Sequence, residues 1–595
     1  MKGKKLWVGV GLSLLMVASM LPALVLTSCS KTTTSTTTAT TITTTTTVTT
    51  AANTPQLGGT LTMLNDVGNE DPTDWDMLTT NNGSVTSVYI QPYLEPYFCG
   101  DINKFGPQPG GSDVTDFTLP QYIPDQYLTG NIAQSWSFQE NPLSLTIVLK
   151  QGIMWAGNSN IGMAPRALTA QDCVFATNTQ ITSASMAPYF TWIKDCVAVD
   201  ATTFKYDFAT YESDWEFFLL YGGGTAFPFC PESQTAGGSN WKNAVGTGPF
   251  ELSNFVDGSS VTYNKNPNYW GTATINGQTY KEPLIDSLVY LIIPDSSTQM
   301  AALETGKLDW YTDIPYNQAS TLTSQAPKLV QYKWTSDSVD VFKANRLDAN
   351  NPVSNLQVRQ ALCEAIDFNS IANDVYGGGN ILGWPVAEGN PAYTPLTNQS
   401  AAVQALFSFN PTAAKQMLAA AGYPKGFTTS ITVDSSYPEQ ADEAQIIVSD
   451  WGQIGVTATI DSLNATELAA EKDNNTFGGY LGFIVATASA GTPLQWYQSG
   501  GLGSTYAASD PIAIEANAAQ AEEDATKQTA DVTQFCKDAL LDAGILPMTN
   551  PYKLNCYWPW LENYYGEVDA AYHNQVIMIR QMWINQTLKS ADGYS

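Results

Sequence analysis

The chain has 595 residues, with 55 acidic and 26 basic side chains and a formal net charge of −29. Because nucleic-acid binding rests on neutralising phosphates, this charge argues against DNA and RNA as partners, and an acidic surface suits solubility outside the cell. The chain is also longer than one hydrophobic core usually serves, so we expect two or more cores.

The first residues have the pattern of an export signal. Lys2, Lys4 and Lys5 precede an apolar run, Leu6–Leu26, which corresponds to the basic and hydrophobic regions of a signal peptide. The same run is long enough to cross a bilayer as an uncleaved anchor. We expect the first alternative, with residues 1–28 as the signal peptide.

The run ends in Leu26-Thr27-Ser28-Cys29, which resembles the lipobox of bacterial lipoproteins. The resemblance implies that the Cys29 thiol is acylated, with more than one acyl chain, because a single chain binds a membrane weakly. Residues 29–55 are mostly threonine and are predicted to be a disordered tether. We therefore expect a protein that is lipid-anchored on the outer face of the cytoplasmic membrane, or in the periplasm.

The folded part opens with strands and one capped helix. The segment 56–64 is expected to form a short strand after the hinge Gly58-Gly59, and a second strand is expected over 143–149, where apolar residues alternate. Thr169 and Asp172 have the spacing of a capping box, which predicts a helix start at Leu168. Further strands are expected over 260–265, 285–293 and 308–310, with a helix near 300–305.

The following part contains clearer helices. Ser354 and Gln357 form a predicted capping box ahead of an apolar face that includes Cys363. Asn410 and Pro411 predict the start of a second helix, which Gly422 ends. A third helix is expected over 438–451 and a strand over 456–460. Strands alternate with helices without a repeat, which indicates an α/β fold of at least two lobes.

Cysteine and histidine are used sparingly. The eight cysteines contain no Cys-x-x-Cys, and seven remain after Cys29, so at least one thiol should be free; Cys363 is expected to pack in a core. His573 is the only histidine, which makes a nickel site improbable because imidazole is the usual nitrogen ligand. We expect no metal and no cofactor.

Several motifs, in this order, resemble family 5 of the extracellular solute-binding proteins, which serve ABC importers of oligopeptides, dipeptides and nickel. They are Gly58-Gly59-Thr60-Leu61, the block 132–149, Val245 to Phe250, Asn266 to Trp270, Val358 to Asp367, Phe409 to Pro424 and Gly544 to Tyr552. Arg359 and Asp367 in this set are expected to be packing and salt-bridge residues.

The family resemblance implies the α/β periplasmic-binding-protein fold of type II, with two lobes and an additional domain. It places lobe I in residues 56–80, 195–325 and 545–595, the extra domain in 81–194 and lobe II in 326–544. It also implies a monomer that encloses a small solute between its lobes and passes it to the permease subunits of an ABC transporter.

Peptide-binding members hold the α-ammonium of the peptide with an aspartate in domain III. The corresponding stretch here, 479–497, contains no carboxylate, and a buried ammonium without a partner is costly. The candidate ligand residues in it are Phe483, Thr487, Ser489, Gln495, Trp496 and Tyr497. Neutral polar groups beside a tryptophan also suit a sugar, so peptide is the first expectation and oligosaccharide the alternative.

Further candidate contacts are Glu70 and Trp75, with Asn69 and Asp71 beside them, after the first strand, and Trp310 and Tyr311 near the lobe crossing. We expect Trp496→Ala to weaken ligand binding without lowering the melting temperature of the empty protein.

A lipid-anchored hydrolase is the rival class. The sequence has no Gly-x-Ser-x-Gly elbow, no His-Glu-x-x-His and no P-loop, but a carboxylate pair for glycoside hydrolysis stays possible. An accessory that presents solute to a chemoreceptor would share the binding fold. We expect a binding protein and not an enzyme.

Overall fold

The structure is a computed structural model that describes residues 54–64, 71–72, 74–78, 85–119, 122–222, 226–336, 338–487, 489, 491–499 and 504–594, with positions 85–87, 188 and 492 described by their backbone only. The signal peptide, Cys29, most of the tether, Asn69 and Glu70 lie outside these residues. Thr54–Ser595 form one compact unit. None of the helices within the described ranges is long and apolar enough to cross a membrane.

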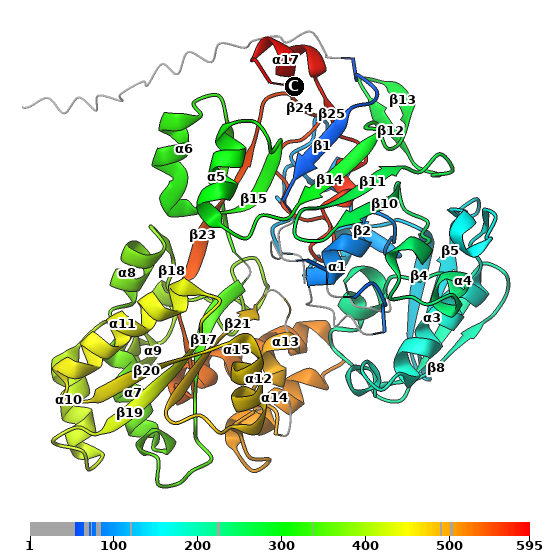
Figure 1. The fold of residues 1–595 in the computed structure, drawn as a ribbon. Coiled ribbons are helices and arrows are strands. Elements are labelled where there is room, and N and C mark those ends of the chain that lie inside the picture. Colours follow the sequence, from blue (N-terminus) through cyan, green and yellow to red (C-terminus); the bar gives the residue numbers. More distant parts are fainter. Residues whose placement is uncertain are drawn as a thin grey trace, which may run out of the picture. The chain divides into compact units, whose positions relative to one another are not determined.

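The largest sheet has eight strands (Figure 1). Their order is β10-β11-β14-β1-β15-β23-β16, and β18 also pairs with β23. The bounds are β1 Thr60–Met63, β10 Phe250–Val256, β11 Ser260–Lys265, β14 Ser287–Leu291, β15 Trp310–Pro315, β16 Val330–Thr335, β18 Gly379–Asn380 and β23 Asn550–Tyr557. The strands expected from the sequence at 56–64, 260–265 and 285–293 are confirmed.

Two helices belong to this part, α5 (Ser296–Glu304) and α6 (Ala319–Gln325). Asp295 caps α5 by accepting from the Thr298 backbone nitrogen at 2.7 Å. The predicted strand at 308–310 begins later and runs as β15. Leu303 of α5 and Leu322 of α6 are fully buried in the same core as the strands.

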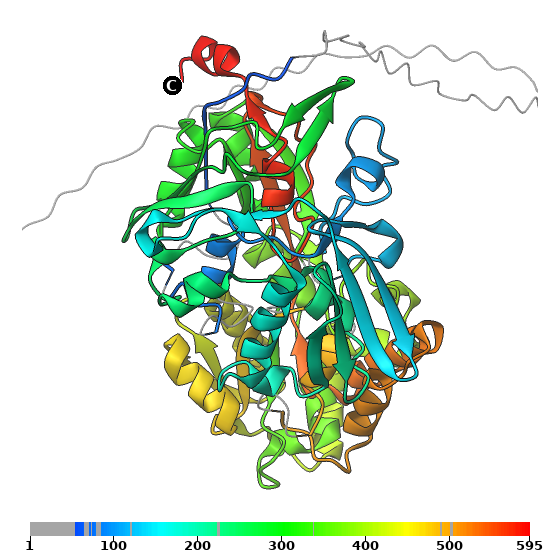
Figure 2. The ribbon, with the colours of Figure 1, turned by 90° about the vertical axis from the view of Figure 1, so that its right-hand side faces the viewer.

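A four-stranded antiparallel sheet has the order β4-β5-β9-β8, and Figure 2 shows its β4–β5 hairpin in cyan. Its elements are β4 Ala133–Glu140, β5 Leu143–Leu149, β8 Ile193–Ala198, β9 Thr203–Phe208 and the helix α3 Ala170–Thr182. The capping box of Thr169 and Asp172 is confirmed. This sheet shares one continuous hydrophobic core with the eight-stranded sheet.

A five-stranded sheet has the order β20-β19-β21-β17-β22. Its bounds are β17 Ser338–Ala344, β19 Thr428–Asp434, β20 Thr457–Leu463, β21 Tyr480–Ala486 and β22 Ile545–Pro547. Side chains alternate between its two faces: Phe342 and Ala344 of β17 enter one core, and Val339 and Val341 enter the other. The predicted strand at 456–460 is confirmed as β20.

Helices cover both faces of this sheet. One core receives α7, α9, α10 and α11, and the other receives α12, α13 and α14, while α15 contributes to both. The bounds are α7 Leu356–Glu364, α9 Ala401–Leu406, α10 Pro411–Ala420, α11 Pro438–Gln453, α12 Ala465–Asn474, α13 Gly491–Gln495, α14 Pro511–Gln520 and α15 Ala525–Asp542. Asn410 caps α10 as predicted.

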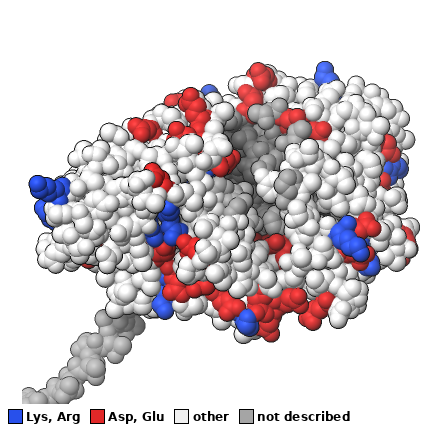
Figure 3. All heavy atoms as spheres, turned by 90° about the horizontal axis from the view of Figure 1, so that it is seen from below, with Lys and Arg blue, Asp and Glu red and all other residues white. Residues whose placement is uncertain are grey.

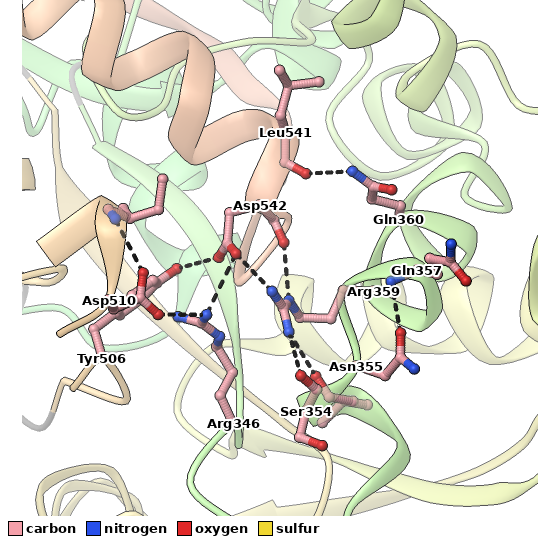
Figure 4. A network of polar contacts seen from close by, with 12 residues as sticks. Arg346, Ser354, Asn355, Gln357, Arg359, Gln360, Tyr506, Asp510, Leu541 and Asp542 are labelled. Atoms are coloured by element: carbon pink, nitrogen blue, oxygen red, sulfur yellow. Dashed lines mark hydrogen bonds and ion pairs between the residues drawn. The ribbon is translucent and has the colours of Figure 1, made fainter. Parts of the chain in front are cut away.

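The predicted cap of α7 is wrong by one residue. Asn355 is the N-cap and accepts from the Gln357 nitrogen at 2.9 Å. Ser354 lies in the preceding 3-10 turn, and its carbonyl oxygen accepts from Arg359 at 3.0 Å. Arg359 also pairs with Asp542 at 2.6 Å, so the prediction of a salt-bridge role is confirmed for Arg359 (Figure 4). Asp367 caps the short helix α8 (Phe368–Ser370).

The remaining elements are short. Two-stranded sheets join β2 Phe98–Gly100 to β3 Leu128–Gly130, β6 Met154–Trp155 to β7 Arg166–Ala167, β12 Thr272–Ile275 to β13 Gln278–Lys281, and β24 Leu561–Glu562 to β25 Trp583–Ile584. The short helices are α1 Val85–Ile90, α2 Ile102–Phe105, α4 Pro231–Thr235, α8 Phe368–Ser370, α16 Val576–Ile579 and α17 Gln586–Ala591. The seven cysteines described are unpaired and buried, Cys363 among them.

The chain passes from the eight-stranded to the five-stranded sheet between β16 and β17 and returns between β22 and β23, and we call these two connections the crossings. Between β17 and β19 the chain also reaches the eight-stranded sheet, where β18 pairs with β23. The predicted limits of lobe II, 326 and 544, fall beside these crossings, but β16 pairs within the larger sheet and β22 within the smaller one. Likewise, β8 and β9 extend the four-stranded sheet past the predicted limit at 194. The division of the chain into lobes and an extra domain remains a proposal.

Candidate ligand site

The stretch predicted to contact ligand follows β21 and meets another part of the chain. The Ser489 hydroxyl donates to Oδ2 of Asp214 at 3.1 Å, and the Gly491 backbone nitrogen donates to Oδ1 of Asp214 at 3.0 Å. Asp214 lies between β9 of the four-stranded sheet and the π-helix Phe217–Tyr221. The contact therefore joins two segments that are separated by 275 residues in sequence.

The close approach depends on glycine. A Cβ atom at Gly491 would lie 2.2 Å from Oδ2 of Asp214, well inside van der Waals contact. Asp214 is 7% exposed and Ser489 is 2% exposed, so the carboxylate is enclosed by the two segments. The stretch that has no carboxylate of its own thus contacts one from the segment after β9.

Two more carboxyl groups flank Asp214 on its segment. The Gln520 amide of α14 donates to Glu212. Burial, and then the charge of Asp214, raise the pKa of Glu212 to about 8. Burial and the neighbouring Asp125 raise the pKa of Glu216 to about 9. This segment is a place where added positive charge is favoured.

The aromatic residues of the predicted stretch lie in the core. Trp496 is 8% exposed and contacts the ring of Phe483, with centroids 4.6 Å apart. Tyr497 is fully buried and accepts from the Trp384 indole nitrogen at 2.7 Å. Thr487 is also fully buried, and its carbonyl oxygen accepts from Ala387 at 2.9 Å. Gln495 is half-buried at the end of α13.

This packing corrects the expectation for Trp496→Ala. Loss of a buried tryptophan leaves a cavity and costs about 3–5 kcal/mol of stability. The variant is therefore expected to lower the melting temperature of the empty protein, because Trp496 belongs to the core of the five-stranded sheet.

Two lysine amines lie near the aromatic rings of residues 479–497. The Lys472 ammonium is 5.4 Å from the Trp496 ring and 5.8 Å from the Phe483 ring. The buried Lys343 amine is 6.0 Å from the Phe483 ring, and burial lowers its pKa to about 7. Positive groups thus lie beside the rings, and carboxyl groups lie on the segment of Asp214.

The other predicted contacts lie in the core around the eight-stranded sheet. Trp75 is 7% exposed and packs on Phe255, with ring centroids 5.7 Å apart. Trp310 is fully buried and donates to Asn555 at 2.8 Å. Tyr311 is 4% exposed and donates to Gln299 at 3.1 Å. The contacts recorded for these three rings hold them within that core, which favours a packing role.

Asp214 was missed in the sequence because the family motif directs attention to residues 479–497. A local signal exists in Glu212-Ser213-Asp214-Trp215-Glu216, where three acids and a tryptophan follow a strand. Nothing in that pentapeptide indicates which distant segment it meets. Within the described ranges, no group of three or more His, Cys, Asp or Glu side chains could hold a metal ion.

Comparison with known proteins gives consistent results. The family described as bacterial extracellular solute-binding proteins, family 5 Middle, matches residues 128–507. The chain is 27% identical to heme-binding protein A of Haemophilus influenzae and 26% identical to the dipeptide-binding protein of Escherichia coli, in each case over 55% of this chain. These matches span 60% and 62% of the two relatives.

Solved structures match over more of the chain. A periplasmic binding protein, DppA, from Helicobacter pylori in complex with the peptide STSA has a TM-score of 0.68 at 20% identity, covering 89% of this chain and 98% of that one. The oligopeptide-binding protein AppA from Bacillus subtilis, in complex with a nonapeptide, has a TM-score of 0.66 at 17% identity, covering 89% and 100%. These likenesses establish the periplasmic-binding-protein fold.

Proposed function

The chain belongs to family 5 of the bacterial extracellular solute-binding proteins, and we propose that it captures a peptide outside the cell and delivers it to an ABC importer. Proteins of this family bind solutes without catalysing a reaction, so the chain is not an enzyme. The hydrolase alternative is set aside on this ground. The export signal, the lipid anchor at Cys29, the monomeric state and the permease partner are parts of the proposal.

The observation that supports a peptide is the position of Asp214. Its carboxylate meets Ser489 and Gly491, in the stretch where peptide-binding relatives are expected to hold the α-ammonium. We propose that Asp214 supplies the charge that this stretch lacks. Because a charge-assisted hydrogen bond in an enclosed site is strong, a peptide N-terminus would be held there.

An oligosaccharide is supported less. A sugar needs an accessible aromatic face, and Trp496 and Tyr497 are 8% and 0% exposed. The acidic surface, in which carboxylates outnumber basic groups on the face shown in Figure 3, fits the expectation that nucleic acid is not a partner.

Ligand identification is the first test. The full-length protein is purified gently, weighed by native mass spectrometry and then denatured to release and sequence any bound solute. We expect a peptide. A released sugar contradicts the peptide proposal, and the absorption spectrum of the same sample reports heme, the solute in the name of one relative.

The second test measures the affinity of the released peptide for Asp214→Asn by calorimetry. Loss of the charge should weaken binding by about 10-fold to 100-fold. Asp257→Asn is the matched control, because Asp257 is exposed in the β10–β11 turn and the charge change is the same. Equal affinity of Asp214→Asn and the wild type would remove Asp214 from the site while leaving the peptide in place.

A further inference from the structure

Two buried carboxyl groups in the five-stranded part share one hydroxyl. The Tyr376 hydroxyl lies 3.1 Å from Oδ2 of Asp340 and 2.9 Å from Oε1 of Glu443. Asp340 is 8% exposed and Glu443 is fully buried. A tyrosine hydroxyl has one hydrogen to donate, so it satisfies one of these two oxygens as donor.

The remaining contacts show which carboxyl group is the anion. Oδ1 of Asp340 accepts from the Gln440 amide at 2.6 Å, so both oxygens of Asp340 have donors. Oε2 of Glu443 is buried without a hydrogen-bond partner. An ionised carboxylate in that state is costly. A protonated Glu443 that donates from Oε1 to the Tyr376 oxygen, with Tyr376 donating to Asp340, satisfies every contact.

The hydrogen-bonded groups Asp340, Tyr376 and Glu443 are linked to the segments that cross between the two sheets. The Met548 backbone nitrogen, between β22 and β23, donates to the Asp340 carbonyl oxygen at 2.8 Å. Tyr376 precedes two glycines that lead into β18, which pairs with β23. The Gly378 carbonyl oxygen accepts from the Tyr552 nitrogen of β23 at 3.1 Å. Movement of either carboxyl group is therefore transmitted to segments that hold the crossings.

We propose that Asp340 and Glu443 hold one proton between them through Tyr376, and that loss of this proton loosens the crossings. In that step the Oε1–H bond of Glu443 breaks and the proton goes to hydroxide or water in the solvent. The two carboxylates then compete for one hydroxyl hydrogen and repel each other in a buried place. Separation of α11 from β17, or withdrawal of Tyr376, relieves the repulsion.

The charged side chains near Asp340 and Glu443 do not cancel the repulsion between the two carboxylates. Glu439 of α11 is half-buried and adds negative charge near both carboxyl groups. Lys553 of β23 lowers the pKa of Asp340, but its effect is smaller than that of burial and of the hydrogen bonds to Gln440 and Tyr376. Lys553 is also paired with Asp313 at 3.0 Å. Burial raises the pKa of Asp340 to about 6, and burial, followed by the charge of Asp340, raises that of Glu443 well above its usual value.

The direction of the pH effect follows from these shifts. A carboxyl group whose pKa is raised on folding binds more protons in the native state than in the unfolded state, so stability falls as pH rises through the interval between the two values. In the unfolded state the pKa values of both carboxyl groups lie near 4. The pair therefore costs stability progressively from mildly acidic pH upward, and the cost is complete above the higher native value.

Glu443→Gln tests the proposal because the amide mimics the protonated acid and can donate to the Tyr376 oxygen. The melting temperature of the full-length protein is measured from about pH 6 to about pH 9. The wild type should lose stability over this range, and the variant should lose less and melt higher at the alkaline end. Asp442→Asn, which neutralises an exposed acid beside Glu443 on α11, is the matched control and should keep the wild-type slope.

Hydrogen exchange reports the crossings directly. After correction for the intrinsic exchange rate at each pH, the amides of 376–380 and 545–552 should exchange faster at alkaline pH in the wild type than in Glu443→Gln. Equal slopes of melting temperature against pH in the two proteins would overturn the shared proton. A difference in melting temperature with unchanged exchange would overturn the link to the crossings.

Discussion

Two groups of carboxylates with little exposure lie in the five-stranded part, and they are neutralised in different ways. Asp542, at the end of α15, is surrounded by donors: Arg359 at 2.6 Å, Arg346 at 3.4 Å and the Tyr506 hydroxyl at 2.9 Å (Figure 4). Asp340 and Glu443 share the Tyr376 hydroxyl, and no cation among the described residues forms an ion pair with either of them. The first group depends on fixed charge, and the second depends on a proton.

The difference has a consequence for pH. Arginine stays protonated at every pH at which the protein folds, so the network of Asp542 should keep its contacts from neutral to alkaline conditions. The pair of Asp340 and Glu443 changes its charge within that range, because burial raises both pKa values. The Asp542 network is suited to holding α7 against α15 across this pH range. The pair of Asp340 and Glu443 is suited to changing the crossings between the sheets when the pH changes.

The largest expected effect is that of Arg359→Met. Three nitrogens of the Arg359 guanidinium donate, to Asp542 and to the carbonyl oxygens of Val353 and Ser354. Removal of one partner of a buried ion pair costs about 3–5 kcal/mol, and Asp542 keeps only the longer contact with Arg346 and the Tyr506 hydroxyl. Urea unfolding at neutral pH measures it. A loss below about 1 kcal/mol would show that the network contributes no more than an exposed pair.

Tyr376→Phe has the next largest effect and sharpens the comparison. It removes the shared hydroxyl and leaves a buried carboxyl group without its donor, which costs about 1–3 kcal/mol. The loss should be greater at alkaline pH than at acidic pH, since the anion needs the donor most. Urea unfolding at two pH values checks this. A loss independent of pH would indicate that Tyr376 acts through packing alone.

Local structure was predictable where short patterns determine it. The cap at Asn410 and the proline after it define the start of α10, and alternating side chains define the strands of the five-stranded sheet. The cap of α7 was displaced by one residue because Ser354 and Asn355 are both good caps, and the 3-10 turn chooses between them.

The site and the charged clusters were not predictable in the same way. Asp214 meets Ser489 across 275 residues, and Arg359 meets Asp542 across 183. No local spacing identifies such a partner. The sequence around Trp496 indicated a ligand contact. In the structure, Trp496 packs against Phe483 of β21 and Lys472 of α12 instead. Family resemblance directed attention to the stretch 479–497, and the fold places the Asp214 carboxylate against it.

Arg346→Lys should have a smaller effect than either change above. Arg346 reaches Asp510 and Asp542 through Nη2, while Nε and Nη1 are buried without partners. One ammonium can replace the single donating nitrogen, but the stacking of the guanidinium on Tyr506, 4.0 Å from the ring centroid, is lost. We expect a loss of about 1 kcal/mol in urea unfolding. A loss as large as that of Arg359→Met would mean that the two arginines act as one unit.

Lys527→Ala is expected to have the smallest effect and to set the scale for an exposed pair. Lys527 contacts Glu522, and Asp531 one turn away at 3.0 Å, on the outer surface of α15. Its side chain is 61% exposed, so water and salt screen both contacts. The melting temperature should change little at low salt and not at all at high salt. A large loss at low salt that disappears at high salt would show that fixed charge stabilises α15 from its exposed side as well, and the contrast between buried arginines and surface lysines would then not hold.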